Sequence, residues 1–297
     1  MIRAWNAGSQ RPTHAAAATV RHRFVLRRLA NHRGGRTGMM LLAVLAVATV
    51  LGPLLVPYDP NWPNYAEALQ APSVAHPLGT DASGRDVLSR LLDGAHRSLG
   101  AAVAVLACLF SVALLLGTTA ALAGGLVDTV VMRCADVMMA LPGLVLAFAV
   151  LGLLGPGLVN LLVAFVIADW AYYARLARAY ALNARSREDV IAARLAGIPG
   201  YRIVLSHILP AVASPLGVVA SLGLGGMISA ISGFSFLGLG VQPPHAEWGA
   251  MLAEARMVFS VAPWLLLTPA CAITIAVAAA NLLGNALRDV LEPGAGP

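Results

Sequence analysis

Apolar runs long enough to cross a membrane recur along most of this chain. The first extends from Gly38 to Pro57, and five more follow at residues 96–124, 127–154, 157–180, 208–240 and 262–288. As a helix, about 20 consecutive apolar residues span the hydrocarbon core of a bilayer. We therefore predict an all-α polytopic membrane protein with six transmembrane helices.

The composition agrees with helices that face lipid. Hydrophobic residues make up 59% of the 297 residues and charged residues only 11%, whereas soluble domains carry about 25% charged residues. A soluble protein of this length needs a much larger polar surface than this chain can supply. The composition therefore excludes an ordinary soluble enzyme.

The arginines predict how the helices are oriented. Sixteen of the 20 basic residues lie in residues 1–37 or in later segments expected on the same side of the membrane. The other side holds only Arg85, Arg90, Arg97 and Arg256. Under the positive-inside rule, the arginine-rich side is cytoplasmic, so both termini are predicted there. This topology explains the net charge of +6 without a nucleic-acid partner.

All basic residues are arginines, and the absence of lysine limits the chemistry of the chain. The glycine-rich loop that binds ATP in many proteins needs a lysine for the phosphates. We therefore expect no cofactor on this chain, and if the protein uses ATP, another chain must bind it. Cys108, Cys134 and Cys271 lack paired spacing and are interpreted as small core residues. The seven histidines are scattered, so no metal site is predicted.

The predicted organisation follows the apolar runs. Residues 1–37 form a basic cytoplasmic arm, 38–57 the first helix, 58–95 an extracytoplasmic loop, 96–290 a five-helix core and 291–297 a cytoplasmic tail. Inside the core, Pro142 predicts a kink in the third helix because proline breaks the hydrogen-bond ladder.

One polar connection does not fit a simple helical bundle. From residue 186 to 210 the chain reads SREDVIAARLAGIPGYRIVLSHILP, which predicts a helix, a turn and a second helix. Glu188 and Asp189 suit the first turn of a helix, and Gly197 suits the turn. Two interpretations remain open: a solvated hairpin on the membrane surface, or a docking element whose alanine face enters a groove of a partner.

This segment resembles the cytoplasmic loop of ABC-importer permeases, whose signature is Glu-Ala-Ala, three residues, Gly, nine residues and Ile-x-Leu-Pro. Ala192, Ala193, Gly197, Leu209 and Pro210 are in register with it, whereas Ile191 replaces the glutamate and His207 the isoleucine. The resemblance implies that residues 186–202 are a coupling loop that contacts an ATPase. Its contact residues would be Glu188, Asp189, Ile191, Ala192, Ala193 and Gly197, with the two acids supplying the missing charge.

Three more motifs narrow the resemblance to the dipeptide/oligopeptide/nickel group of permeases, second-permease type. They are HPLGTDASGRDVLSRLLDGAHRSL (76–99), GFSFLGLGVQPPHAEWGAML (233–252) and NALRDVLEP (285–293). The stretches ADWAYYARLAR (168–178) and VIAARLAG (190–197) look closer to nickel or metal-chelate permeases than to peptide permeases. The resemblance covers about residues 40–293.

The resemblance implies a type I importer fold and a role that is not enzymatic. The chain would form half of the pathway for a nickel or metal chelate, or for di- or oligopeptides, in a bacterial inner membrane. Its partners would be a homologous second permease, two ATPase subunits and an extracytoplasmic substrate-binding protein. The alternative is a secondary transporter driven by an ion gradient, which predicts inverted repeats and charge pairs within the membrane.

A stripe of small residues marks the fifth apolar run. Gly217, Ser221, Gly225, Ser229 and Gly233 recur every four positions. Because four residues turn a helix by about 400°, these positions follow one slowly winding line. In lipid, such a line lets two helix backbones approach closely. The stripe packs either inside this chain or at the seam with a second permease, along the passage.

Asp169 is an acidic residue near the middle of an apolar run. A carboxylate at the centre of a bilayer costs about 2.5–3.5 kcal/mol on insertion scales, so it is expected to face a partner or a cavity. One interpretation is a buried hydrogen bond to Tyr172, Tyr173 or a neighbouring helix. The other is a carboxylate on the translocation path of a cationic substrate.

A charged group precedes the second apolar run. Asp81, Arg85 and Asp86 either cap that helix and pair locally or meet a docked binding protein. Trp248 is interpreted as an interface aromatic at the outer headgroup level, again as a candidate contact for the binding protein.

Overall fold

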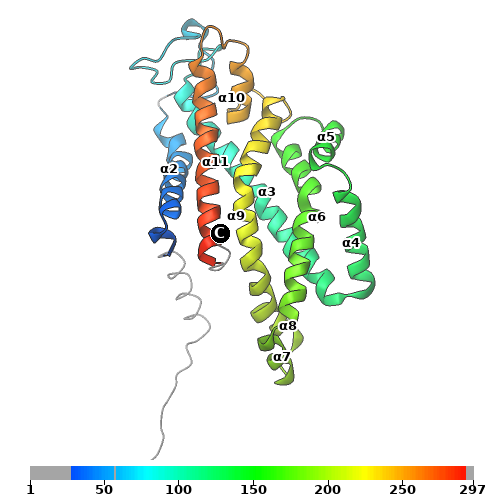
Figure 1. Ribbon diagram of the computed structural model, residues 1–297. Coiled ribbons are helices and arrows are strands. Elements are labelled where there is room, and N and C mark those ends of the chain that lie inside the picture. Colours follow the sequence, from blue (N-terminus) through cyan, green and yellow to red (C-terminus); the bar gives the residue numbers. More distant parts are fainter. Residues whose placement is uncertain (1–27, 57, 292–297) are drawn as a thin grey trace, which may run out of the picture.

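The computed structural model describes residues 28–56 and 58–291. Residues 1–27 of the predicted basic arm and residues 292–297 of the predicted tail lie outside the described residues. Long helices run side by side along the length of the molecule (Figure 1). The long helices are α2 (Arg33–Leu55), α3 (Val87–Ala123), α4 (Gly125–Met139), α5 (Gly143–Leu154), α6 (Leu158–Arg185), α9 (Leu209–Phe236) and α11 (Trp264–Leu291).

Short elements lie in the connections. They are η1 (Tyr65–Glu67), α7 (Glu188–Leu195), α8 (Gly200–Ile203), the π-helical turn η2 (Val204–Ile208) and α10 (Trp248–Ala255). Among the described residues, five helical runs are long and apolar enough to cross a membrane, and the bent pair α4–α5 makes a sixth if it is counted as one span. The predicted all-α membrane fold is therefore confirmed.

The predicted kink in the third span is a full break. Helix α4 ends at Met139, and α5 begins at Gly143 with its axis bent by 92°. Pro142 stands at the break, where its ring and its missing N–H prevent one helix from continuing into the next. The span therefore consists of two short helices instead of one.

Helix α3 begins earlier than the apolar run predicts. The Asp86 carboxylate accepts a hydrogen bond from the Ser89 N–H at 2.8 Å, which caps the helix at residue 87. At 37 residues, α3 is about 55 Å long and exceeds the hydrocarbon core of about 30 Å. Its first turns therefore extend beyond the apolar layer and carry charged residues.

The centre of the bundle is the crossing of α3 and α6. On α6, alanines line the buried side: Ala164, Ala171, Ala174, Ala177, Ala181 and Ala184. Opposite them, a Cβ atom added to Gly117 of α3 would collide with the Ala174 carbonyl and lie 2.8 Å from the Arg178 nitrogen. Small side chains thus let the two backbones meet.

The cysteines do not lie in the core, contrary to our prediction. Cys108 on α3, Cys134 on α4 and Cys271 on α11 are all exposed. A small apolar side chain is equally compatible with lipid and with a helix interface, so its position in an apolar run does not predict which side it faces.

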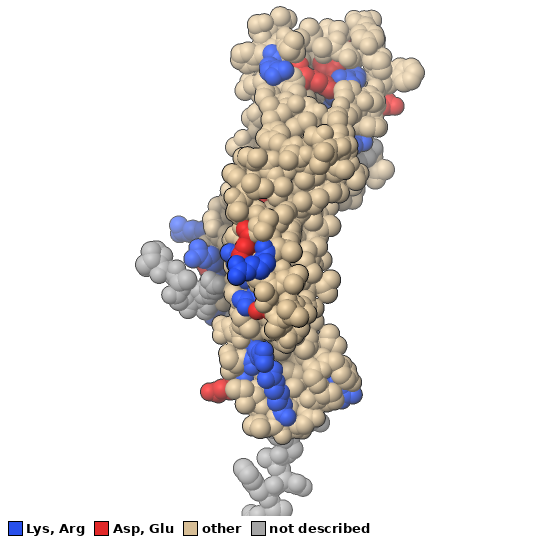
Figure 2. Space-filling model, turned by 90° about the vertical axis from the view of Figure 1, so that its right-hand side faces the viewer, with Lys and Arg blue, Asp and Glu red and all other residues tan. Residues whose placement is uncertain are grey.

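The two ends of the molecule differ. One end is the cap, which we define as residues 58–86, helix α10 and the turn 256–263. At the other end, α7 and α8 project beyond the bundle (Figure 1). His32, before α2, lies 3.5 Å from Asp289 of α11, so α2 begins where α11 ends, on the side of that projection. Figure 2 shows an almost uncharged band between the cap and the charged lower half.

Candidate functional site

The projecting loop 186–202 has the predicted helix–turn–helix form. Helix α7 ends in a pair of hydrogen bonds, from Gly197 N–H to the Arg194 carbonyl at 3.0 Å and from Ile198 N–H to the Ala193 carbonyl at 3.1 Å. This is the Schellman arrangement, which needs a left-handed residue after the helix. Gly197 supplies it with φ +73°, and its missing side chain would face open space.

The residues predicted to contact an ATPase divide into two sets. Glu188, Asp189, Ile191 and Ala192 are exposed, whereas Ala193 is buried within the chain. Sequence reasoning missed Leu195 and Tyr201, which are 85% and 62% exposed on the same projection. Large apolar side chains within a polar loop were the signal that could have identified them.

The loop joins α9 without a gap in helical backbone. The Leu209 N–H donates to the Val204 carbonyl five residues earlier, which makes η2 a π-helical turn. Pro210 follows and has no N–H for the Ser206 carbonyl, so the regular ladder cannot form there. From Gly200 to Phe236 the chain is therefore one helical run that links the loop to the centre of the bundle.

The small-residue stripe of α9 divides along its length. At Gly225, an added Cβ would lie 2.5 Å from the Asn281 Oδ1 of α11, and one at Gly284 would lie 3.1 Å from the Ser221 carbonyl. These positions pack inside the chain. An added Cβ at Gly217 or Gly233 would meet nothing within 4 Å, and Ser229 is exposed. The outer parts of the stripe leave room for another surface.

Asp169 lies opposite the break between α4 and α5. A Cβ on Gly143 would lie 3.4 Å from its Oδ1 atom. Within the described residues, neither Tyr172, Tyr173 nor another residue forms a hydrogen bond or ion pair with this carboxylate. The expected hydrogen bond to a tyrosine is therefore wrong for this structure, while the role on the translocation path stays a prediction.

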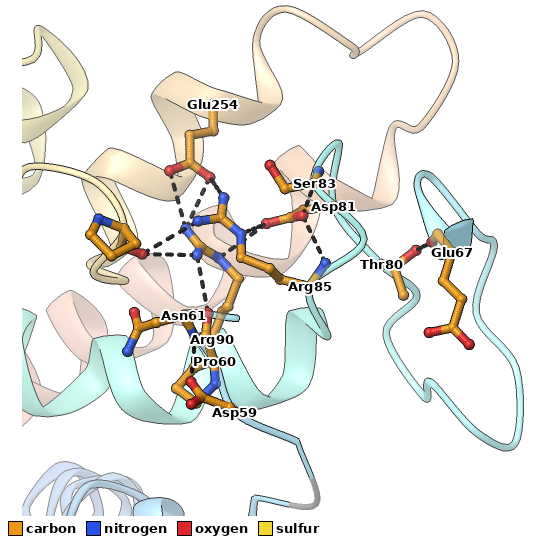
Figure 3. Close-up of polar contacts among 11 residues, drawn as sticks. Asp59, Pro60, Asn61, Glu67, Thr80, Asp81, Ser83, Arg85, Arg90 and Glu254 are labelled. Carbon is orange, nitrogen blue, oxygen red and sulfur yellow. Dashed lines mark hydrogen bonds and ion pairs between the residues drawn. The ribbon is translucent and has the colours of Figure 1, made fainter. Parts of the chain in front are cut away.

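The cap is held together by two arginines and two acids (Figure 3). Arg85 Nε lies 2.7 Å from Asp81 Oδ2, and its Nη2 lies 2.9 Å from Glu254 Oε2. Arg90, fully buried, donates to the same Glu254 carboxylate and to the carbonyls of Pro60 and Pro244. The four charged residues line a cavity of about 360 Å³.

Two predicted contacts for a binding protein lie inside the cap instead of on it. Asp86 is 2% exposed, caps α3 and lies 2.9 Å from His76 Nδ1. Trp248 is also 2% exposed, and its indole N–H donates to the Leu91 carbonyl at 2.9 Å. Both predictions are corrected to structural roles, because Asp86 is enclosed by its partners in the cap and at the start of α3, and Trp248 packs against α3. For Asp81 and Arg85, contact with a binding protein stays a prediction.

Comparison with known proteins agrees with this geometry. Residues 113–296 match the family model described as the binding-protein-dependent transport system inner membrane component. The chain belongs to this family. Residues 23–72 match the N-terminal transmembrane domain of oligopeptide transport permease C. The predicted resemblance to ABC-importer permeases is confirmed, and the protein is a multi-pass inner-membrane permease.

The relatives of this permease include nickel permeases and peptide permeases. It is 40% identical to the nickel transport system permease protein NikC of Escherichia coli over 258 residues, 87% of this chain and 93% of that protein. It is 41% identical to a putative peptide transport system permease of Brucella abortus, over 90% of each chain. With the di/tripeptide permease DppC of Pseudomonas aeruginosa, identity is 37% over 89% of each.

Proposed function

We propose that this permease forms half of the translocation pathway of an ATP-driven importer for a nickel chelate or a di- or oligopeptide. A homologous second permease supplies the other half, two ATPase subunits bind and hydrolyse ATP with Mg²⁺, and an extracytoplasmic binding protein delivers the substrate. The names of the nickel and peptide relatives support this substrate range. In residues 28–56 and 58–291, no group of three acidic, histidine or cysteine side chains could hold a metal ion, which favours a chelate over a bare ion.

The observation that carries the proposal is the projecting loop 186–202. It combines exposed acids at the start of α7 with the exposed apolar side chains Leu195 and Tyr201. A short helix of this kind suits a groove in a partner. The unbroken helical run from Gly200 to Phe236 offers a direct mechanical connection from an ATPase to the bundle.

The orientation follows from the charges. Sixteen arginines belong to the side predicted as cytoplasmic, and the contact between His32 and Asp289 assigns the start of α2 and the end of α11 to one side. The loop 186–202 projects on that side, where ATP is available. The cap then faces outward, and its exposed Trp62, Tyr65 and Val74 offer a surface for the binding protein.

Gly197→Arg tests the coupling role in the reconstituted complex. Arginine at this position should leave the spans inserted but obstruct the docking surface, because the side chain would project into open space. We expect weaker ATPase docking or loss of substrate-stimulated hydrolysis and uptake. Gly197→Asn is the matched control, because asparagine tolerates the left-handed conformation.

The control should retain docking, stimulation and uptake. Full uptake and normal stimulation with Gly197→Arg would make the loop a passive linker and refute the coupling role. Uptake that requires an ion gradient and ignores ATP would support the secondary transporter instead.

A further inference from the structure

The position of Asp169 along α6 predicts a carboxylate deep in the membrane. Asp169 is 11 residues after Leu158, the first residue of α6, and therefore about 16 Å along the helix axis. This is close to half of a hydrocarbon core of about 30 Å. The side chain is only partly buried. An ionisable group at this depth marks a functional position and requires a compensating partner.

Other acids of the same helix pair have such partners. Arg178 of α6 binds Asp128 of α4 through two contacts of 2.5 Å. Arg175 of α6 binds Asp136 of α4. Both arginines near Asp169 on its own helix are thus committed to α4. Asp169 has no ion pair within the described part of the chain, so its compensating charge comes from elsewhere.

The surroundings of Asp169 attract cations. The phenol ring of Tyr172, one turn further along α6, is exposed and presents a π-face to which cations bind. Across from the carboxylate, the break leaves Leu141 exposed and Gly143 without a side chain. Carboxylate and ring both favour a positively charged ligand.

We propose that Asp169 and Tyr172 form a station in the translocation pathway that binds the positive charge of the substrate. The ligand is a protonated amine, as at the amino end of a peptide, or a cationic metal chelate. The inference rests on the proposed function and adds the position at which this chain touches its substrate.

A permanent counter-ion from the second permease is the competing explanation. The structure favours the substrate because the chain already compensates Asp128 and Asp136 with its own arginines. Of the acids of α4 and α6, Asp169 beside the helix break is the one that no described residue compensates. Discontinuous spans at mid-membrane are the usual location of transported ions and charged groups in transporters.

Charge-selective labelling tests the station without relying on transport. In an assembled complex whose chain has Cys108, Cys134 and Cys271 replaced by alanine, Tyr172→Cys provides a thiol beside the carboxylate. It is treated with a trimethylammonium and with a sulfonate methanethiosulfonate of similar size. At each cysteine we compare the reaction rate of the cationic reagent with that of the anionic reagent. We expect this ratio to be on the order of tenfold higher at Tyr172→Cys than at a control cysteine.

Asp169→Asn should abolish that preference, whereas Asp169→Glu should preserve it. The control is Met257→Cys, which is highly exposed in the turn 256–263 of the cap, away from the helix break. Its reagent preference should not change with Asp169→Asn. If Tyr172→Cys fails to assemble, Leu141→Cys probes the same space from the other side of the break.

Three results would overturn the proposal. Equal reaction with both reagents, or a preference that survives Asp169→Asn, removes the carboxylate as a cation site. Absence of labelling with and without ATP assigns Asp169 to a covered subunit contact. If the preference depends on Asp169 but uptake does not need ATP, the station stands and the proposed importer mechanism fails, so the two hypotheses remain distinguishable.

Discussion

Arg90 donates to both carboxylate oxygens of Glu254, at 2.9 and 3.1 Å, although the two residues are far apart in sequence. Both contacts come from Nη2, and the pair joins the first turns of α3 to α10 and so anchors the cap to the bundle. Since Arg90 is fully buried, its guanidinium depends on protein acceptors.

Removing the Glu254 carboxylate should loosen the cap. In Glu254→Ala, the buried guanidinium of Arg90 loses two acceptors, and we expect the free energy of unfolding to fall by about 1–3 kcal/mol. Thermal denaturation of the purified permease measures this. As control, Glu188→Ala on the exposed loop should change stability by less than about 0.5 kcal/mol. Equal stability of both variants would contradict the anchoring role.

Gly117 should tolerate no side chain. In Gly117→Ala, the new methyl group would collide with the backbone of α6 at Ala174 and Arg178, so the helices must separate and folded protein should be lost. Gly100→Ala on the same helix is the matched control, because its Cβ would meet nothing within 4 Å. Alanine is the better helix former by about 1 kcal/mol, so the control should be neutral or stabilising. The yield of monodisperse protein in detergent distinguishes them.

Two adjacent glycines of α9 should respond oppositely to enlargement. Gly225→Leu would force Asn281 of α11 aside and should reduce assembly and uptake. Gly226→Leu would project into open space and should leave this chain folded. If Gly225→Leu assembles and transports normally, our assignment of its packing is wrong. If folded Gly226→Leu fails to bind the second permease, the open side of α9 is the seam between permeases.

The orientation can be tested from the basic arm. Ser9, which lies outside the described residues, is predicted to be cytoplasmic because the arm contains eight arginines and no acid. In intact cells, Ser9→Cys in a chain without other cysteines should resist thiol reagents that do not cross membranes. It should react once the membrane is permeabilised. Ready labelling in intact cells would reverse the topology.

Sequence reasoning succeeded where local chemistry determines structure. Apolar runs predict spans because lipid requires them, Pro142 predicts a bend at the place where the structure has a full break, and Gly197 predicts the turn. Each of these signals lies within a few residues of its effect.

What the sequence could not predict depends on contacts across the fold. Arg178 pairs with Asp128 only because α6 and α4 lie side by side. The sequence of neither segment predicts which residue is the partner. The sequence predicts Trp248 at the membrane interface. The side chain is instead covered, because its indole packs against α3 and donates to the Leu91 carbonyl. For Asp86, the sequence left capping and contact with a binding protein open, and the three-dimensional structure assigns the cap, with which α3 begins before its apolar run.

The π-helical turn at Val204–Ile208 holds one residue more than the α-helical turns around it. One added residue corresponds to a rotation of about 100° around the helix axis. The side chains before the π-helical turn, such as Tyr201, are therefore rotated by this angle around the helix axis relative to the positions that a regular helix through Gly200–Phe236 would give them. Deleting one residue within this turn would restore a single phase and swing the loop 186–202 by a quarter turn, so that its exposed surface would point away from any subunit seated beneath it.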